Sequence, residues 1–238
     1  MSDPNALDPR RRELRETLLL AAPLALANLL WMAIGTTDVI FVAMLGQQPL
    51  AASSLAVTQY MLISWALTGL TGAVAPLVAA ELGRRQHAVR EVRRSVRMAL
   101  WLAVGTGVLG IAACAWGEEF MHLTGQDPAI SRQAGSFLSI IRWAIPAMVI
   151  SSVQRTFVSA LGRPLLATAI TAVAILVNAL GNWALIFGHF GLPAMGLDGS
   201  ALASVITAFS MVAAYGLVIA GDRRLRRYRL LGNWWRPE

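Results

Sequence analysis

Residues 18–45 read LLLAAPLALANLLWMAIGTTDVIFVAML, an apolar stretch whose only charged side chain is Asp38. About 20 apolar residues in a helix, at about 1.5 Å rise per residue, span a hydrocarbon core roughly 30 Å thick. This stretch is therefore long enough to cross a membrane. Because an acidic side chain is costly to bury in such a span, Asp38 is predicted to face a bundle interior or a wet cavity and to bind an ion or a proton.

The rest of the chain repeats this apolar pattern. Mean hydropathy over the 238 residues is +0.58, and the charged residues, only 14% of the total, fall into short clusters. Five further stretches of 20 or more residues carry almost no charge, namely 50–80, 98–117, 134–154, 164–187 and 199–221. We predict an all-α, polytopic membrane protein with six transmembrane helices.

The basic residues predict how these helices are oriented. All 20 are arginines, and 18 of them lie before the first stretch, after the sixth, or in connections on that same side of six crossings. By the positive-inside rule, both termini are expected on the cytoplasmic side. The protein is then a multi-pass protein of the cell membrane, which in a bacterium is the inner membrane. The chain then divides into a basic N-terminus (1–17), a six-helix lobe (18–221) and a basic tail (222–238).

Composition argues against several other classes of protein. A pI near 11.1 can indicate nucleic acid binding, but these arginines flank membrane spans without interleaved aromatic residues, so no nucleic acid partner is expected. The three histidines lie in or beside loops, with no cluster of Cys or carboxylates at ligand spacing. We therefore expect that the protein has no structural metal site and no cofactor, and that it is not an enzyme. An intramembrane serine protease, for example, would need a buried histidine as its base.

Asp38 shares its expected depth with polar residues of the fifth and sixth stretches. Counted from the same side, Asp38 lies roughly 30 Å along its helix, and Asn178 and Asn182 lie roughly 21 and 27 Å along theirs. The two asparagines are four residues apart and so share one helical face. Ser204 is expected near the same level. Such oxygen ligands suit a hard cation, and the carboxylate can equally take up a proton. Alternatively, the asparagines can form structural hydrogen bonds between helices.

Several segments together resemble one transporter family. They are LAAPL (20–24), TTDV (36–39) followed by Leu45 and Gly46, APLVAAELG (75–83), ALGRP (160–164) and NALGNWALIFGHFGLP (178–193). Spread over essentially the whole chain, they resemble the multidrug and toxic compound extrusion (MATE) transporters.

This resemblance implies a function and a site. It implies antiport of small organic compounds, often cationic and lipophilic, coupled to Na⁺ or H⁺ through alternating access of two six-helix lobes. Asp38 matches the acidic residue of the family's first helix, and Asn178 and Asn182 match two polar positions of its fifth helix. One branch of the family has Asp at the second of these positions; Asn resembles the branch associated with sodium, without excluding protons. No metal is implied beyond a possible Na⁺ at these residues.

The chain departs from the family in length. Family members are about twice as long, and the pattern around Asp38 has no second copy here. We expect an amino-terminal lobe that is incomplete alone and pairs with a second six-helix lobe. A truncated reading frame, a split gene and a half-transporter all remain open as explanations of the length.

Two alternatives to a MATE-type transporter remain as well. One is a lipid-linked oligosaccharide flippase, although Arg142 is the only basic residue inside a span, and the other is a non-transporting membrane interaction module.

Overall fold

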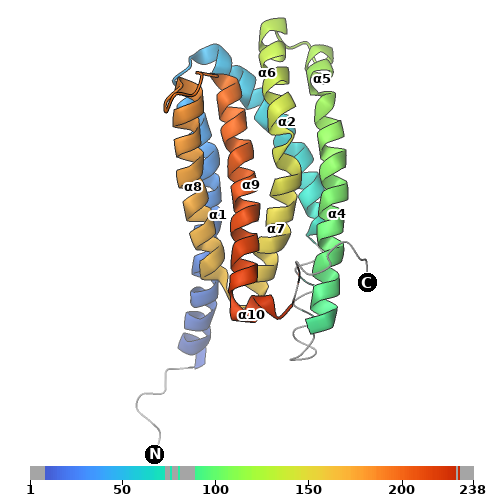
Figure 1. The fold of residues 1–238 in the computed structure, drawn as a ribbon, viewed down its shortest axis with the longest axis vertical. Helices are drawn as coiled ribbons and strands as arrows, with labels where there is room; N and C mark the ends of the chain where they lie inside the picture. The colour runs from blue at the N-terminus through green and yellow to red at the C-terminus, as the bar shows by residue number, and fades with distance from the viewer. Residues whose placement is uncertain (1–8, 73–75, 77–79, 81–88, 229, 231–238) are drawn as a thin grey trace, which may run out of the picture.

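Every regular element of the described chain is an α-helix (Figure 1), which confirms the predicted fold class. The computed structural model describes residues 9–72, 76, 80, 89–228 and 230. The helices are α1 (Pro9–Ala43), α2 (Gln47–Thr71), α4 (Val89–Ala115), α5 (Gly117–Leu123), α6 (Pro128–Ile141), α7 (Ala144–Ala160), α8 (Pro164–Phe187), α9 (Leu197–Gly221) and α10 (Arg223–Arg226).

Most of these helices are long and apolar enough to cross a membrane. Among the described residues, five helices qualify, and the number rises to six when the bent pair α6 and α7 counts as one span. These spans agree with the six predicted stretches. Part of the second stretch, residues 73–75 and 77–79, lies outside the described residues.

The fourth span differs from the single helix expected over residues 134–154. It consists of α6 and α7, which meet at an angle of 48°. Pro146 explains the break, because proline has no N–H to donate and its ring collides with the carbonyl four residues earlier, that of Arg142. The Arg142 carbonyl instead accepts a hydrogen bond from the backbone N–H of Ile145, at 3.1 Å. The kink therefore begins one turn before the proline.

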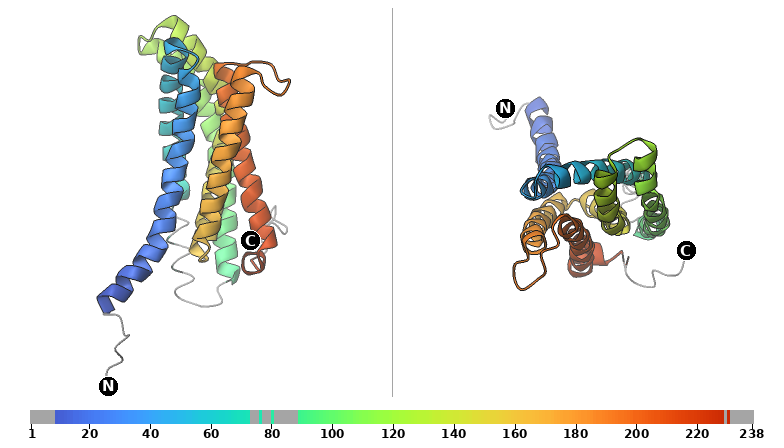
Figure 2. Two further views of the ribbon diagram at one scale, coloured as in Figure 1. Left: turned by 90° about the vertical axis from the view of Figure 1, so that its left-hand side faces the viewer. Right: turned by 90° about the horizontal axis from the view of Figure 1, so that it is seen from above.

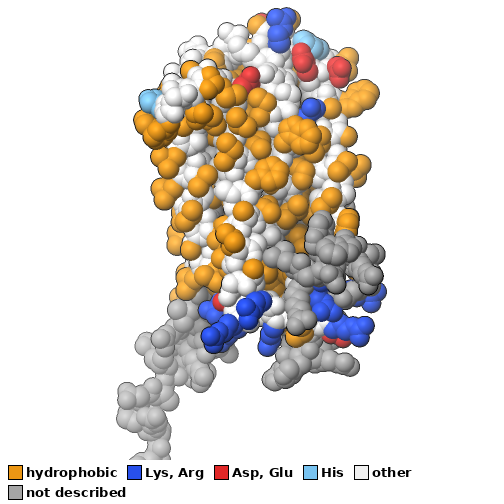
Figure 3. Space-filling model, viewed as in Figure 1, with side chains coloured by type: hydrophobic (Ala, Val, Ile, Leu, Met, Phe, Trp, Pro, Cys, Tyr) orange, Lys and Arg blue, Asp and Glu red, His pale blue; other side chains and the backbone are white. Residues whose placement is uncertain are grey.

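The helices pack as an upright bundle (Figure 2). α8 packs against both α1 and α9, α9 also contacts α7, and α7 in turn packs against α4. α2 closes the bundle against α4 and α6. Apolar side chains cover the flank of the bundle, and arginines gather below them at the end that carries α10 (Figure 3). An apolar flank between polar ends is what a lipid bilayer requires.

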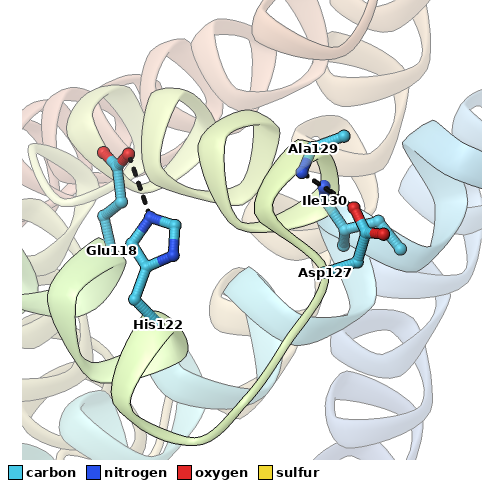
Figure 4. A network of polar contacts seen from close by, with 5 residues as sticks. All are labelled: Glu118, His122, Asp127, Ala129 and Ile130. Carbon is cyan, nitrogen blue, oxygen red and sulfur yellow. Dashed lines mark hydrogen bonds and ion pairs between the residues drawn. The ribbon is translucent and has the colours of Figure 1, made fainter.

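Polar side chains organise the opposite end of the bundle, where α5 and α6 meet. Asp127 caps α6, because its Oδ1 accepts hydrogen bonds from the backbone N–H groups of Ala129 (2.8 Å) and Ile130 (3.3 Å) (Figure 4). On α5, His122 Nε2 lies 3.8 Å from a carboxylate oxygen of Glu118, one turn earlier. This end thus carries acidic side chains and few arginines, whereas the other end is rich in arginine.

A close backbone contact sets α9 against α8. A Cβ on Gly199 would lie 2.6 Å from the carbonyl oxygen of Leu185, which is closer than real contacts allow. The loop before α9 returns along α8 as well, since the backbone N–H of Met195 donates to that same carbonyl, at 2.9 Å. The absence of a side chain at Gly199 therefore lets the first turn of α9 lie directly against the last turns of α8.

Candidate ion site

The four residues selected from the sequence come together from three helices. Asp38 lies on α1, five residues before the helix ends at Ala43. Asn178 and Asn182 lie on α8, and both are fully buried. Ser204 lies on α9, which packs along α8. The expected common depth of these side chains therefore corresponds to one cluster.

Both oxygens of the Asp38 carboxylate accept hydrogen bonds within this cluster. Oδ1 accepts from Nδ2 of Asn182 at 2.6 Å and from Nδ2 of Asn178 at 2.9 Å. Oδ2 accepts from the hydroxyl of Ser204 at 3.0 Å. The amide of Asn182 also donates toward its neighbour, to the backbone oxygen of Asn178 at 3.1 Å and to its Oδ1 at 3.3 Å. The carboxylate is thus held on two sides, by α8 and by α9.

Ser204 reaches Asp38 because α8 and α9 approach closely at this level. A Cβ on Gly181 would lie 3.1 Å from Cβ of Ala203, a contact tighter than most. Gly181 directly precedes Asn182, and Ala203 directly precedes Ser204. Small residues at this crossing bring the two backbones together, as is common between helices in membranes. The sequence indicated the depth of Ser204 but not this contact.

The cluster has spare oxygen ligands and little charge. The three side chains that hydrogen-bond Asp38 are all neutral, so no positive charge among them balances the carboxylate. Oδ1 of Asn182 is buried and has no hydrogen-bond partner in the part of the chain that the structure describes. In that part, no group of three or more His, Cys, Asp or Glu residues could hold a metal ion. One carboxylate among neutral oxygens is suited to a single positive charge.

Aromatic side chains that follow the cluster residues along the chain make contacts that the sequence did not predict. The rings of Phe41 on α1 and Phe187 on α8 are 6.2 Å apart, so they join the two helices just beyond the carboxylate. Trp183 stacks on His189, with ring centroids 4.0 Å apart. Spacing along the chain could not reveal these contacts, because they depend on how each helix is rotated.

Arg142 does not join the cluster. It caps α6 at the break before α7, and its Cζ lies 6.0 Å from the ring centroid of Trp143.

Comparison with known sequences identifies the family. The profile of the MatE family matches residues 23–184, more than half of the chain and a range that includes Asp38, Asn178 and Asn182. The chain belongs to the MatE family. This result confirms the resemblance seen in the sequence, and it confirms that the bundle is a multi-pass membrane assembly of the MATE type.

Curated relatives match almost the whole chain. A "Probable multidrug resistance protein NorM" of Mesorhizobium japonicum is 41% identical over 229 residues, covering 96% of this chain and 49% of the relative. A protein of the same name from Brucella suis is 37% identical over 228 residues, covering 95% and 48%. The chain thus spans about half the length of the curated relatives that it matches.

A solved structure shows the same fold. The crystal structure of a MATE protein in a bent conformation superposes with a TM-score of 0.77 at 17% sequence identity. The superposition covers 87% of this chain and 45% of that protein. The bundle therefore has the architecture of about half a MATE transporter.

Proposed function

We propose that this chain forms one lobe of a MATE-type efflux transporter, in which Na⁺ or H⁺ binding at Asp38 is coupled to antiport of small organic compounds out of the cell. Family membership supports the transport class. The observation that carries the site is the Asp38 carboxylate, held by three neutral donors beside an unpartnered oxygen of Asn182.

This geometry favours a single positive charge as the coupling species. A proton on Asp38 would neutralise the carboxylate and leave its hydrogen bonds to Asn178 and Ser204 largely in place. Sodium would instead require oxygen ligands, which the carboxylate, the hydroxyl of Ser204 and the amide oxygen of Asn182 can supply when the amides rotate. Either species removes an unbalanced charge from a membrane span, where such a charge is costly.

The substrates and the second lobe are also part of this proposal. The named relatives are multidrug resistance proteins about twice as long as the residues they share with this chain. Small organic compounds, often cationic and lipophilic, are therefore the proposed substrates. A second six-helix lobe would complete a cavity that one lobe only half encloses, as in transporters built from repeats.

The proposed orientation places the arginine-rich end in the cytoplasm. Cys114 is buried, so a single accessible cysteine can report on this end after Cys114→Ala removes the native thiol. Arg226→Cys, an exposed position on α10, should then react with a membrane-impermeant maleimide only after the cytoplasmic side is opened. Labelling of Arg226→Cys in intact cells would reverse the orientation.

Ion binding to the purified full chain tests the site directly. Wild-type protein in detergent is titrated with Na⁺ at several pH values, by calorimetry or by tryptophan fluorescence. Asp38→Asn preserves size and should abolish both the Na⁺ response and its competition with protons.

Asp198→Asn is the matched control for this titration. Asp198 is also a carboxylate that accepts from a serine, since the hydroxyl of Ser136 lies 3.0 and 2.9 Å from its two oxygens, but it lies at an exposed end of the bundle. Binding lost equally in both variants, or retained in Asp38→Asn, would contradict the assignment.

A further inference from the structure

A pocket of about 310 Å³ opens at the arginine-rich end of the bundle. It is lined by Leu161, where α7 ends, and by Arg224, Arg227 and Tyr228, in and directly after α10. None of these residues belongs to the candidate ion site. Figure 3 shows arginines of this end directly below the apolar flank, where a lipid headgroup would lie in a bilayer.

Asp222 anchors the short helix α10, which contains Arg224 and is directly followed by Arg227. Its Oδ1 accepts hydrogen bonds from the backbone N–H groups of Arg224 (2.8 Å) and Leu225 (3.3 Å). Its Oδ2 lies 3.1 Å from Nη2 of Arg163. The hydrogen bond from the backbone N–H of Arg224 is the main cause of the lowered pKa of Asp222. This carboxylate is therefore already engaged and does not line the pocket.

Tyr228 fixes the other side of the pocket. It is buried, and its ring packs edge-on against Phe157 with centroids 5.5 Å apart. Arg227 lies over the Tyr228 ring, with Cζ 5.3 Å from the centroid, and its Nη2 donates to the tyrosine hydroxyl at 3.4 Å. One guanidinium is thus positioned by a rigid aromatic side chain, and this bond uses only one of its five N–H donors.

The lining combines two positive charges with an apolar wall. Arg224 and Arg227 are three residues apart, and no acidic residue is among the four that line the pocket. The like charges repel, so an anion between them would relieve that repulsion. Planar guanidinium groups match the oxygens of a phosphate better than a point charge does. Leu161 adds an apolar contact that a free inorganic ion would not use.

We propose that this pocket binds the phosphate group of an anionic phospholipid through Arg224 and Arg227, with Leu161 against the lipid's glycerol and first methylenes. This proposal concerns lipid recognition and does not depend on the transport function proposed above. Free inorganic phosphate carries the same kind of charge as the lipid headgroup, so the test must distinguish binding of the lipid from binding of the free ion.

Native mass spectrometry of the full chain in detergent measures this binding. The protein is titrated with phosphatidylglycerol and, separately, with phosphatidylcholine, whose headgroup has no net charge. We expect one anionic lipid to be retained in preference to phosphatidylcholine. Arg224→Gln with Arg227→Gln should weaken its binding about tenfold or more, the effect expected when charge-assisted hydrogen bonds are lost.

Arg223→Gln with Arg226→Gln is the matched control, because it removes the same charge from the same short segment at positions that do not line the pocket. Its lipid affinity should remain within about twofold of wild type, since only screened surface charge is lost. Circular dichroism checks that both double variants retain their helices. Equal losses in the two variants, or no preference for the anionic lipid, would overturn the proposal.

Inorganic phosphate provides the remaining arm of the test. Added in excess over the lipid, it should displace little phosphatidylglycerol, because it makes no contact equivalent to that of Leu161. Leu161→Ser should then weaken lipid binding while leaving any binding of phosphate unchanged. Full displacement by phosphate, together with no effect of Leu161→Ser, would show a site for the free anion and overturn the lipid assignment.

Discussion

Asp38 and Asp222 are two carboxylates that each accept several hydrogen bonds, but within the described residues only Asp222 pairs with a positive side chain. Asp38 is held by two amides and a hydroxyl, from two other helices. Asp222 accepts from two backbone N–H groups of its own short helix and pairs with Arg163, 3.1 Å away. The two carboxylates thus have similar hydrogen bonding, but the charge of Asp222 is balanced by Arg163, whereas the groups that hydrogen-bond Asp38 are neutral.

The difference indicates what each carboxylate can do. The charge of Asp222 is matched locally by a guanidinium and a helix N-terminus, so its role is to fix the start of α10. The neutral donors around Asp38 orient its carboxylate without cancelling its charge. Only such a group gains from binding a mobile cation or proton.

The largest expected effect is on ion-driven transport. In a chimera that joins this chain to the remaining half of the Mesorhizobium relative, Asp38→Asn should abolish ion-driven drug efflux from proteoliposomes, because the titrating charge is removed. Asp222→Asn should transport nearly as well as the parent chimera. If both variants lost transport equally, with normal expression, the distinction between the two carboxylates would be broken.

The asparagines should matter less than the carboxylate. Asn182→Ala and Asn178→Ala should each weaken Na⁺ binding on the order of tenfold, since each removes a neutral dipole from the site, worth about 1–2 kcal/mol. We expect Asn182→Ala to be the more damaging, because Asn182 makes the shorter bond to Asp38 and carries the unpartnered oxygen. A calorimetric Na⁺ affinity that was weaker in either asparagine variant than in Asp38→Asn would contradict this order.

The contact between α8 and α9 can be tested through Gly181. Gly181→Val places two methyl groups where even a Cβ would lie 3.1 Å from that of Ala203, so the helices must separate. We expect a loss of about 1–3 kcal/mol of stability, as for other overpacked sites, and a weaker Na⁺ affinity as Ser204 moves away from Asp38. Ser204→Ala is the comparison variant, because it removes the hydroxyl without moving the helices. Its stability should stay near wild type.

The smallest effect is expected at Asp222, and it depends on pH. The pKa of Asp222 is lowered in the folded protein, chiefly by the hydrogen bond from the backbone N–H of Arg224. Its stabilising contribution is therefore present above the ordinary aspartate pKa of about 3.9 and is lost as the pH falls through the lower folded value. Asp222→Asn keeps the cap and should lower the unfolding temperature slightly at pH 7. The difference in unfolding temperature between wild type and Asp222→Asn should narrow below about pH 4. High salt should also reduce this difference. An unfolding-temperature difference that widened in acid would contradict this account.

The sequence alone predicted the number of spans, an orientation for them, and the residue at the centre of the proposed site. Length and hydropathy indicate spans, because crossing a bilayer requires an uninterrupted apolar helix of a fixed length. The segregated arginines predict orientation, and Asp38 stands out because a charge in such a span is costly. Even the depth of the asparagines could be estimated, since rise per residue is constant.

Tertiary structure decided which atoms meet. Rotation and crossing of α1, α8 and α9 determine that both asparagines donate to the same oxygen of Asp38 and that Ser204 takes the other. The contact at Gly181 and the pocket beside Arg224 depend likewise on residues far apart in the chain. Hydropathy is a property of each segment separately, whereas a contact between side chains depends on the relative placement of two helices, which packing alone determines.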